Sequence, residues 1–246
     1  IRRLVAKALA ASVQADVRAW FGADLLGEAR PNGTDVAVHA TRSWVNRHEG
    51  VTGRVGAKAD IANAHPAVRR QSCLGALRRS LPAVSPWLEY CYGCSSKLII
   101  AGEVIDSAAG LHCGDPLAGV AWSAALMEVY PEARRRADDG AGKLDMAFWF
   151  KDDGWASGDG AAVARYLLAI RTLGPPHGIV LSEKKLELVI PAGSPPIADL
   201  SAFTAGRPPA AASTASTCSG RRRVGRAAAA ARPRVRAARR SSVVER

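Results

Sequence analysis

Two adjacent aspartates, Asp152 and Asp153, are the residues of this chain that most directly suggest chemistry. They follow a short apolar run in MAFWFKDDGWASGD (146–159), and a glycine and a second short run come directly after them. This pattern predicts a β-hairpin that carries both carboxylates at its tight turn. Because neighbouring like charges repel, a positive group is expected beside them. The alternative is an ordinary polar surface turn, since Asp and Gly are common turn residues.

A third aspartate, Asp60, closes the strand predicted in GRVGAKADIANA (53–64). If this strand and the hairpin are neighbours in one sheet, three carboxylates converge. Mg²⁺ prefers oxygen ligands and keeps open positions for water and phosphate. Two such ions can activate an attacking hydroxyl and stabilise a leaving pyrophosphate. They would also offset the repulsion within the aspartate pair.

The elements that must position these acids alternate between helical and strand patterns, and no internal repeat is evident. The apolar spacing predicts helices over 1–21, up to Gly50, over 65–82, over 86–93, over 116–137 and over 159–174. Strand patterns occupy 53–60, a hairpin around Ala101-Gly102 within 96–112, the Asp-Asp hairpin and a strand pair within 178–191. This order predicts an α/β (α+β) fold with the acids at strand ends.

Positive charge is concentrated at the C-terminal end of the chain. The formal net charge is +12, of which residues 191–246 carry +9 through 11 arginines against two acids. With few large apolar residues, this tail is predicted to be disordered and to lack stable packing from about Gly193 onward. Its arginine clusters suit nucleic-acid binding or a nuclear address. A compositional bias or a shifted reading frame would produce the same pattern.

Composition sets limits on the remaining functions. Apolar residues make up 48% of the chain, yet no stretch approaches the roughly 20 apolar residues of a membrane span, so no membrane association is expected. Five cysteines without a secretory leader indicate reduced, intracellular thiols. Cys91 and Cys94 have metal-like spacing but no second pair at zinc-site distance, which favours buried thiols over zinc. Trp87, Tyr90 and Tyr92 could stack on bases, although core packing is favoured.

Four segments in order resemble the palm of a reverse transcriptase of the non-LTR retrotransposon type. They are KADIANAHPAVRR, GLHCGDPLAGVAWSAALMEV, FWFKDDGWASGD and GIVLSEKKLELVI, and they cover about residues 53–191. The resemblance implies a palm over 53–191, with an antiparallel sheet backed by helices. It also implies partial fingers or a helical lead-in over 1–52, and leaves 192–246 as the disordered basic tail. Another palm-type enzyme, such as a nucleotide cyclase, is disfavoured by the Gly-Asp-Pro-Leu segment.

The resemblance assigns a metal site to residues at the strand ends. Asp60, Asp152 and Asp153 match the metal-binding aspartates, and the backbone carbonyl of Ile61 is a further candidate ligand. Two Mg²⁺ ions are implied, with Mn²⁺ as a substitute. Lys185 matches a lysine that approaches the incoming triphosphate and can donate a proton to pyrophosphate.

The resemblance also assigns a nucleotide site. Gly114, Asp115 and Pro116 match the turn that supports the template and the incoming nucleotide. His65 occupies the position whose aromatic residue screens out the ribose 2′-hydroxyl. The implied partners are an RNA template, a DNA primer and deoxynucleoside triphosphates, and the implied location is intracellular, in the nucleus.

Several positions depart from the family pattern. His65 replaces the aromatic residue, Cys113 replaces the Gln before Gly-Asp-Pro, and Lys151 replaces the small residue before Asp-Asp. A fingers arginine for the triphosphate and a thumb are both predicted to be absent. The implied function is therefore an RNA-directed DNA polymerase domain, a nucleotidyltransferase, that extends a primer very poorly as this chain alone. The alternative is a non-catalytic remnant that at most binds nucleic acid.

Overall fold

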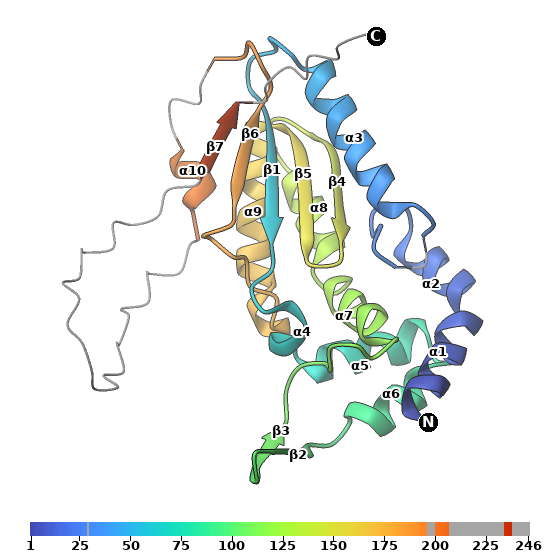
Figure 1. The fold of residues 1–246 in the computed structure, drawn as a ribbon. Helices are drawn as coiled ribbons and strands as arrows, with labels where there is room; N and C mark the ends of the chain where they lie inside the picture. The colour runs from blue at the N-terminus through green and yellow to red at the C-terminus, as the bar shows by residue number, and fades with distance from the viewer. Residues whose placement is uncertain (29, 196–199, 207–233, 238–246) are drawn as a thin grey trace, which may run out of the picture.

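A five-stranded sheet organises the computed structural model, which describes residues 1–28, 30–195, 200–206 and 234–237 (Figure 1). The strand order is β4-β5-β1-β6-β7. The strands are β1 (Arg54–Asp60), β4 (Leu144–Phe150), β5 (Asp153–Asp159), β6 (Glu187–Ile190) and β7 (Arg234–Ala237). The pairs β4–β5, β5–β1 and β1–β6 are antiparallel, whereas β6–β7 is parallel. The chain thus has the predicted α/β fold, with an antiparallel core sheet.

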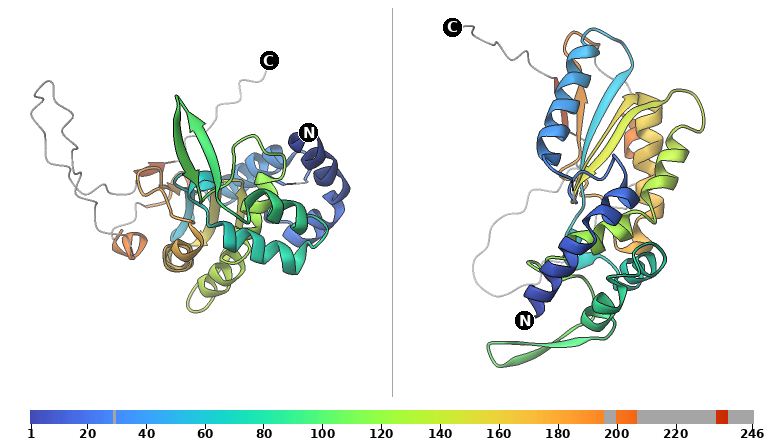
Figure 2. Two further views of the ribbon diagram at one scale, coloured as in Figure 1. Left: turned by 90° about the horizontal axis from the view of Figure 1, so that it is seen from below. Right: turned by 90° about the vertical axis from the view of Figure 1, so that its right-hand side faces the viewer.

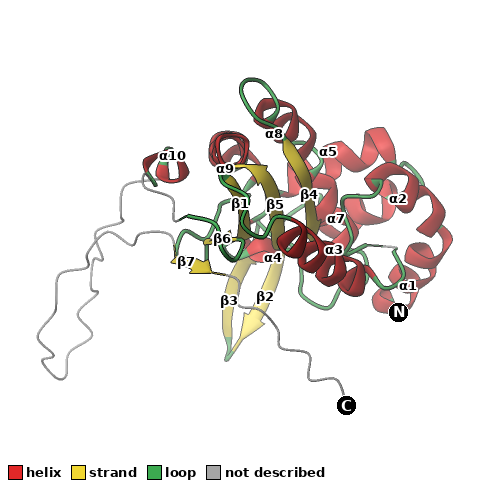
Figure 3. Ribbon diagram, turned by 90° about the horizontal axis from the view of Figure 1, so that it is seen from above, coloured by secondary structure: helices red, strands yellow, loops and turns green. Residues whose placement is uncertain are grey.

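Helices cover both faces of the sheet, and strand alternation decides which residues face them (Figure 3). Helices α8 (Tyr130–Ala137) and α9 (Gly160–Leu173) lie on one face, where small residues such as Ala57 and Ala156 join the main core. Helix α3 (Gly33–Arg47) lies on the other face, where Trp44 joins Phe148 and Trp155 in a second cluster. Asp60 shares the α3 side of the sheet, because it lies two residues from Lys58, whose cross-strand partner is Trp155.

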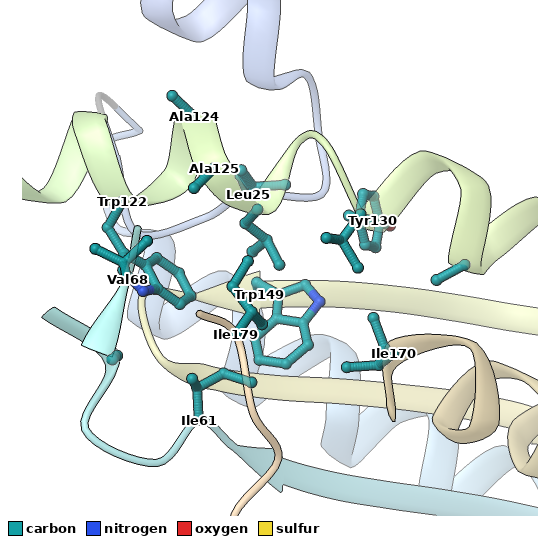
Figure 4. Close-up of a cluster of buried hydrophobic side chains, with 14 of the residues drawn as sticks. Leu25, Ile61, Val68, Trp122, Ala124, Ala125, Tyr130, Trp149, Ile170 and Ile179 are labelled. Atoms are coloured by element: carbon teal, nitrogen blue, oxygen red, sulfur yellow. The ribbon is translucent and has the colours of Figure 1, made fainter. Parts of the chain in front are cut away.

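The main core lies directly behind the strand ends that carry the acids (Figure 4). Ile61 follows Asp60 and is 2% exposed, and it packs among Trp149 from β4, Ile179 and Trp122. The indole Nε1 of Trp149 donates to Tyr166 Oη at 2.8 Å. Since packed cores resist displacement, this cluster fixes where β1 and β4 end.

Both predicted hairpins are present. Strands β4 and β5 are joined by Lys151 and Asp152, since Phe150 pairs with Asp153. Strands β2 (Ser96–Ile100) and β3 (Glu103–Ser107) are joined by Ala101-Gly102, whose φ angles of +52° and +86° suit a type I′ turn. The β2–β3 hairpin projects from the body (Figure 2) and forms its own two-stranded sheet. Only Asp153 of the aspartate pair lies within a strand, because the turn itself is Lys151-Asp152.

The predicted helix over 65–82 is wrong as one element. The chain forms α4 (Ala64–Ala67) and α5 (Arg70–Ser80), separated by Val68 in an extended conformation. Tertiary hydrogen bonds use the backbone groups freed by this break. Val68 O accepts from Gly110 N at 3.2 Å, and Arg69 N donates to His177 O at 3.0 Å.

The predicted helix over 116–137 is also divided, into α7 (Ala118–Leu126) and α8. Pro131 lies in the first turn of α8, where its missing N–H costs nothing, so α8 begins as a new helix. The N-terminal helical segment is likewise α1 (Arg2–Ser12) and α2 (Gln14–Phe21). The short helix is confirmed as α6 (Ser85–Tyr92), and the helix after the Asp-Asp hairpin is confirmed as α9.

The C-terminal part departs from the prediction in two places. Within 178–191 only β6 is a strand, after a 3-10 turn, η1 (Pro175–His177), and an isolated bridge between Ile61 and Leu181. The absence of packing expected beyond Gly193 is wrong for α10 (Ser201–Thr204), whose Phe203 is buried in the main core. It is also wrong for the strand β7. The rest of the predicted tail, 207–233 and 238–246, lies outside the described residues. Among the described helices, none is long and apolar enough to cross a membrane.

Candidate active site

Asp60 and Asp153 are brought together by strand pairing. Asp60 ends β1, Asp153 begins β5, and the two are direct partners in the antiparallel register. Directly opposite residues of one sheet face have neighbouring side chains. Asp152 lies one residue away in the turn, where its carbonyl oxygen accepts from Ile61 N at 3.0 Å. The three aspartates singled out in the sequence, 93 residues apart at most, therefore lie at the adjoining ends of β1 and β5.

The turn before Asp153 presents a lysine as well as an acid. Lys151 has a φ of +55°, and Asp152 is not among the residues with positive φ. That pattern matches a type II′ turn, which normally has Gly at the first central position. A non-glycine residue held in this region is a local strain that the surrounding structure must support. Gly27 is part of this supporting structure, because its backbone packs directly on Lys151.

Lys185 reaches the first aspartate from a third segment. Its Nζ lies 2.9 Å from Asp60 Oδ1, forming an ion pair. Ser182 N donates to Asp60 O at 2.7 Å and Lys185 N donates to Ser182 O at 2.9 Å, so a tight turn places the lysine. The other carboxylate oxygen, Asp60 Oδ2, is buried and has no hydrogen-bond partner.

Both lysines and neighbouring carboxylates act on the acids. Burial raises the pKa of Asp153, Lys58 lowers it, Asp152 and Asp60 raise it, and Lys185 lowers it. The ion pair with Asp60 raises the pKa of Lys185. Asp153 therefore binds a proton more readily than an ordinary surface aspartate does.

The donor atoms suit a hard divalent cation, but the side chains are not gathered around one. Carboxylate oxygens are the ligands that Mg²⁺ prefers, and the buried, unpartnered Oδ2 of Asp60 offers a ready ligand. Within the part of the chain that the structure describes, however, no three His, Cys, Asp or Glu side chains converge as a metal-binding group. Asp60 instead faces the ammonium of Lys185.

A cavity of about 460 Å³ extends to Lys151, the residue that precedes Asp152 in the hairpin turn. It is lined by the predicted nucleotide-site residues His65, Gly114, Asp115 and Pro116, together with Cys113 and Lys151. The sequence prediction missed three further lining residues, Arg3 and Lys7 from α1 and Glu28. Arg3 and Lys7 are four residues apart and so share a helix face, which was the available signal.

Asp115 holds the Gly114-Pro116 turn in place. Its Oδ2 accepts from Tyr92 Oη at 2.6 Å and from Arg2 Nη2 at 3.1 Å, and its Oδ1 accepts from Leu117 N at 3.0 Å. The Asp115 side chain is only 5% exposed. With its acceptors engaged, this carboxylate acts on the turn rather than on a ligand. Tyr92 is thus a buried supporting residue rather than a base-stacking one.

His65 and Glu28 both line this cavity, and burial shifts the pKa of each residue toward its neutral form. Burial lowers the pKa of His65, Asp152 raises it and Lys151 lowers it, so a neutral imidazole is favoured. The His65 ring stacks on Trp122 with centroids 6.4 Å apart. Burial raises the pKa of Glu28 to about 7, against the attraction of Lys151. The Glu28 carboxylate packs against Gly119, where an added Cβ would collide with it.

A second, more apolar cavity of about 410 Å³ lies on the α3 side of the sheet. Aromatic side chains of Phe148, Phe150 and Trp155 form its floor, and Asp153 and Lys58 lie at the same surface. It therefore adjoins the acid site on the face opposite α9.

The chain combines an antiparallel core sheet, helices on both of its faces and two acids paired at adjoining strand ends. No protein-family model matches the chain, and no curated protein matches it. Among solved structures it is similar to apo telomerase from Candida tropicalis truncated from its C-terminal domain. The TM-score is 0.51 at 10% identity, over 74% of this chain and 40% of that one.

It is also similar to telomerase from Candida albicans in complex with a TWJ fragment of telomeric RNA. The TM-score is 0.50 at 12% identity, over 76% of this chain and 33% of that one. The chain therefore spans well under half of these neighbours. At such identities the likeness concerns the fold.

Proposed function

We propose that this chain is the palm of an RNA-directed DNA polymerase of the non-LTR retrotransposon type. The observation that carries the proposal is the direct pairing of Asp60 with Asp153, next to a turn whose Lys151 lines a cavity with Arg3 and Lys7. The RNA-bound state of one structural neighbour supports nucleic acid as the partner class. An RNA template, a DNA primer and deoxynucleoside triphosphates are the proposed partners, with action in the nucleus.

Asp60, Asp152 and Asp153, with the Ile61 carbonyl, are the proposed holders of two Mg²⁺ ions, with Mn²⁺ as a substitute. When bound, such ions would lower the barrier for attack of a primer hydroxyl on the α-phosphate. The residues of the chain supply binding and orientation. Asp153 opposes Asp60 across the strands, so both side chains project from the same face of the sheet.

The cavity is the proposed nucleotide site. Arg3, Lys7 and Lys151 are charged to meet the phosphates, since cations and phosphate oxygens form strong charge-assisted hydrogen bonds. The neutral, stacked His65 limits room beside the sugar. Lys185 lies at the acids and is the proposed proton donor to the leaving pyrophosphate.

A fluorescent deoxynucleoside triphosphate titrated into the chain tests the nucleotide site. Lys7→Gln should weaken binding about tenfold, or about 1.4 kcal/mol, by removing one phosphate contact. Lys97→Gln on the projecting hairpin is the control, because it removes the same charge at an exposed ion pair with Asp106. Equal losses in both variants would reduce the effect to net charge and argue against the site.

Primer extension on an RNA template separates the polymerase from the second candidate, a non-catalytic remnant. His65, Cys113 and Lys151 depart from the family pattern and favour that remnant. We expect very weak extension with Mn²⁺ that Asp152→Asn with Asp153→Asn abolishes. Equal background from the chain and the double variant, with nucleic-acid binding intact, would support the remnant instead.

A further inference from the structure

Asp60 divides its two carboxylate oxygens between very different surroundings. Oδ1 accepts a hydrogen bond from Lys185 Nζ at 2.9 Å, whereas Oδ2 is buried without a partner in the described structure. The residue as a whole is 9% exposed. A buried carboxylate oxygen left without a donor is costly, so its retention points to a ligand that is to be bound there.

The Lys185 side chain can move away from Asp60 without a change in the backbone. Its side chain is 67% exposed although its ammonium contacts Asp60. The backbone around it is fixed by the Ser182–Asp60 and Lys185–Ser182 hydrogen bonds, so the side chain alone can swing into water. An exposed lysine loses little solvation when it exchanges one partner for another.

Two lysines offset most of the negative charge of the site before any ion arrives. Three aspartates, Asp60, Asp152 and Asp153, interact with Lys185, and Lys58 acts on Asp153 as well. A divalent cation that enters this cluster encounters the ammonium of Lys185 at the Asp60 carboxylate, which is the ligand that it needs. Like charges a few ångströms apart repel each other even in partly watery surroundings.

We infer that Lys185 is the resident counter-ion of Asp60 and competes with divalent cations for its carboxylate, so that cation binding requires Lys185 to swing out. The inference rests on the proposed metal site but not on catalysis. Lys185 thus controls occupancy of the site: the chain keeps an acid cluster whose charge is largely compensated, and it binds a divalent cation only weakly on its own.

Titration of the full chain with Mn²⁺ tests this, with free Mn²⁺ followed by electron paramagnetic resonance. Lys185→Gln should tighten Mn²⁺ binding about tenfold, because it removes the competing cation and leaves both Asp60 oxygens available. Lys184→Gln is the matched control: it makes the same charge change at the adjacent exposed residue and should change affinity little. Lys185→Arg keeps the competing charge and should bind Mn²⁺ as weakly as the parent chain.

Two further measurements keep the result specific. Asp60→Asn in the Lys185→Gln background should abolish the gain, which locates the ion. The midpoint of thermal unfolding should rise more with Mn²⁺ in Lys185→Gln than in the parent chain, because the ion replaces the lost counter-ion.

Four outcomes would overturn the inference. Lys185→Gln could bind Mn²⁺ no more tightly than the parent chain. Lys184→Gln could tighten binding equally, or Lys185→Arg could behave like Lys185→Gln. Asp60→Asn could leave the gain intact. A failure of primer extension alongside tightened Mn²⁺ binding would count against the proposed polymerase function only, so the two failures are distinguishable.

Discussion

Replacing Glu28 by glutamine should stabilise the protein at neutral and alkaline pH. Glu28 lines the cavity beside Lys151 and packs against Gly119 at the start of α7. Its segment is anchored to the edge of β4, where Leu26 N donates to Trp149 O at 2.7 Å. Glutamine has nearly the same shape, so Glu28→Gln removes the charge while keeping the packing.

The magnitude follows from the raised pKa of Glu28. Burial moves it from 4.5 to about 7. At 1.36 kcal/mol per unit, the ionised form therefore costs the folded state about 3 kcal/mol. Because the pKa is raised on folding, this cost is small near pH 5, grows as the pH rises toward 7, and is constant above that. The variant should thus gain about 3 kcal/mol over the parent at pH 8 but less than about 1 kcal/mol at pH 5.

Urea unfolding of both proteins at pH 5 and pH 8 measures this difference. Glu103→Gln is the control, since Glu103 lies exposed on the projecting hairpin and should show no such pH dependence. A stability difference that is the same at both pH values would refute the reasoning. It would mean that Lys151 or bound water compensates the charge fully in the folded state.

Three other changes test particular contacts. Phe203→Ala should lower the free energy of unfolding by about 3 kcal/mol, since Phe203 is buried in the main core, and an unchanged urea midpoint would show that α10 is not docked. Tyr92→Phe should cost about 1.5 kcal/mol by removing its hydrogen bond to Asp115, and it should also weaken nucleotide binding by loosening the 114–116 turn. Nucleotide binding unaffected by this change would separate the turn from the cavity. Gly56→Ala should cost about 2 kcal/mol because its methyl group would lie 2.6 Å from the Trp155 ring. Full stability with an unchanged near-ultraviolet circular dichroism spectrum would contradict that packing.

Features determined by neighbouring residues could be predicted from the sequence. The Ala101-Gly102 turn and the Asp-Asp hairpin follow from local turn chemistry and strand alternation. The strand ending at Asp60 was predicted for the same reason. The break at Val68 could not be predicted, because its backbone partners, Gly110 and His177, lie far along the chain.

The candidate site shows the same division. Asp60, Asp152 and Asp153 were singled out from their positions at predicted strand ends, and Lys185 from the resemblance to a known family. Arg3 and Glu28 were not, because they reach the cavity only after α1 and the segment before α3 pack against the body. Cavity walls drawn from several elements depend on tertiary packing, which periodicity does not report.

The pairing of β1 with β5 has a consequence for how the protein folds. The β4–β5 hairpin closes a two-residue loop, whereas Asp60 and Asp153 meet only when a loop of 93 residues closes. By the (3/2)RT ln n scaling, that closure costs about 4 kcal/mol of chain entropy. The hairpin can therefore form within microseconds, but β1 must wait for a long-range search that slows folding. The acid pair is assembled late, so a chain whose β1 has not yet docked has a complete Asp-Asp hairpin and no site.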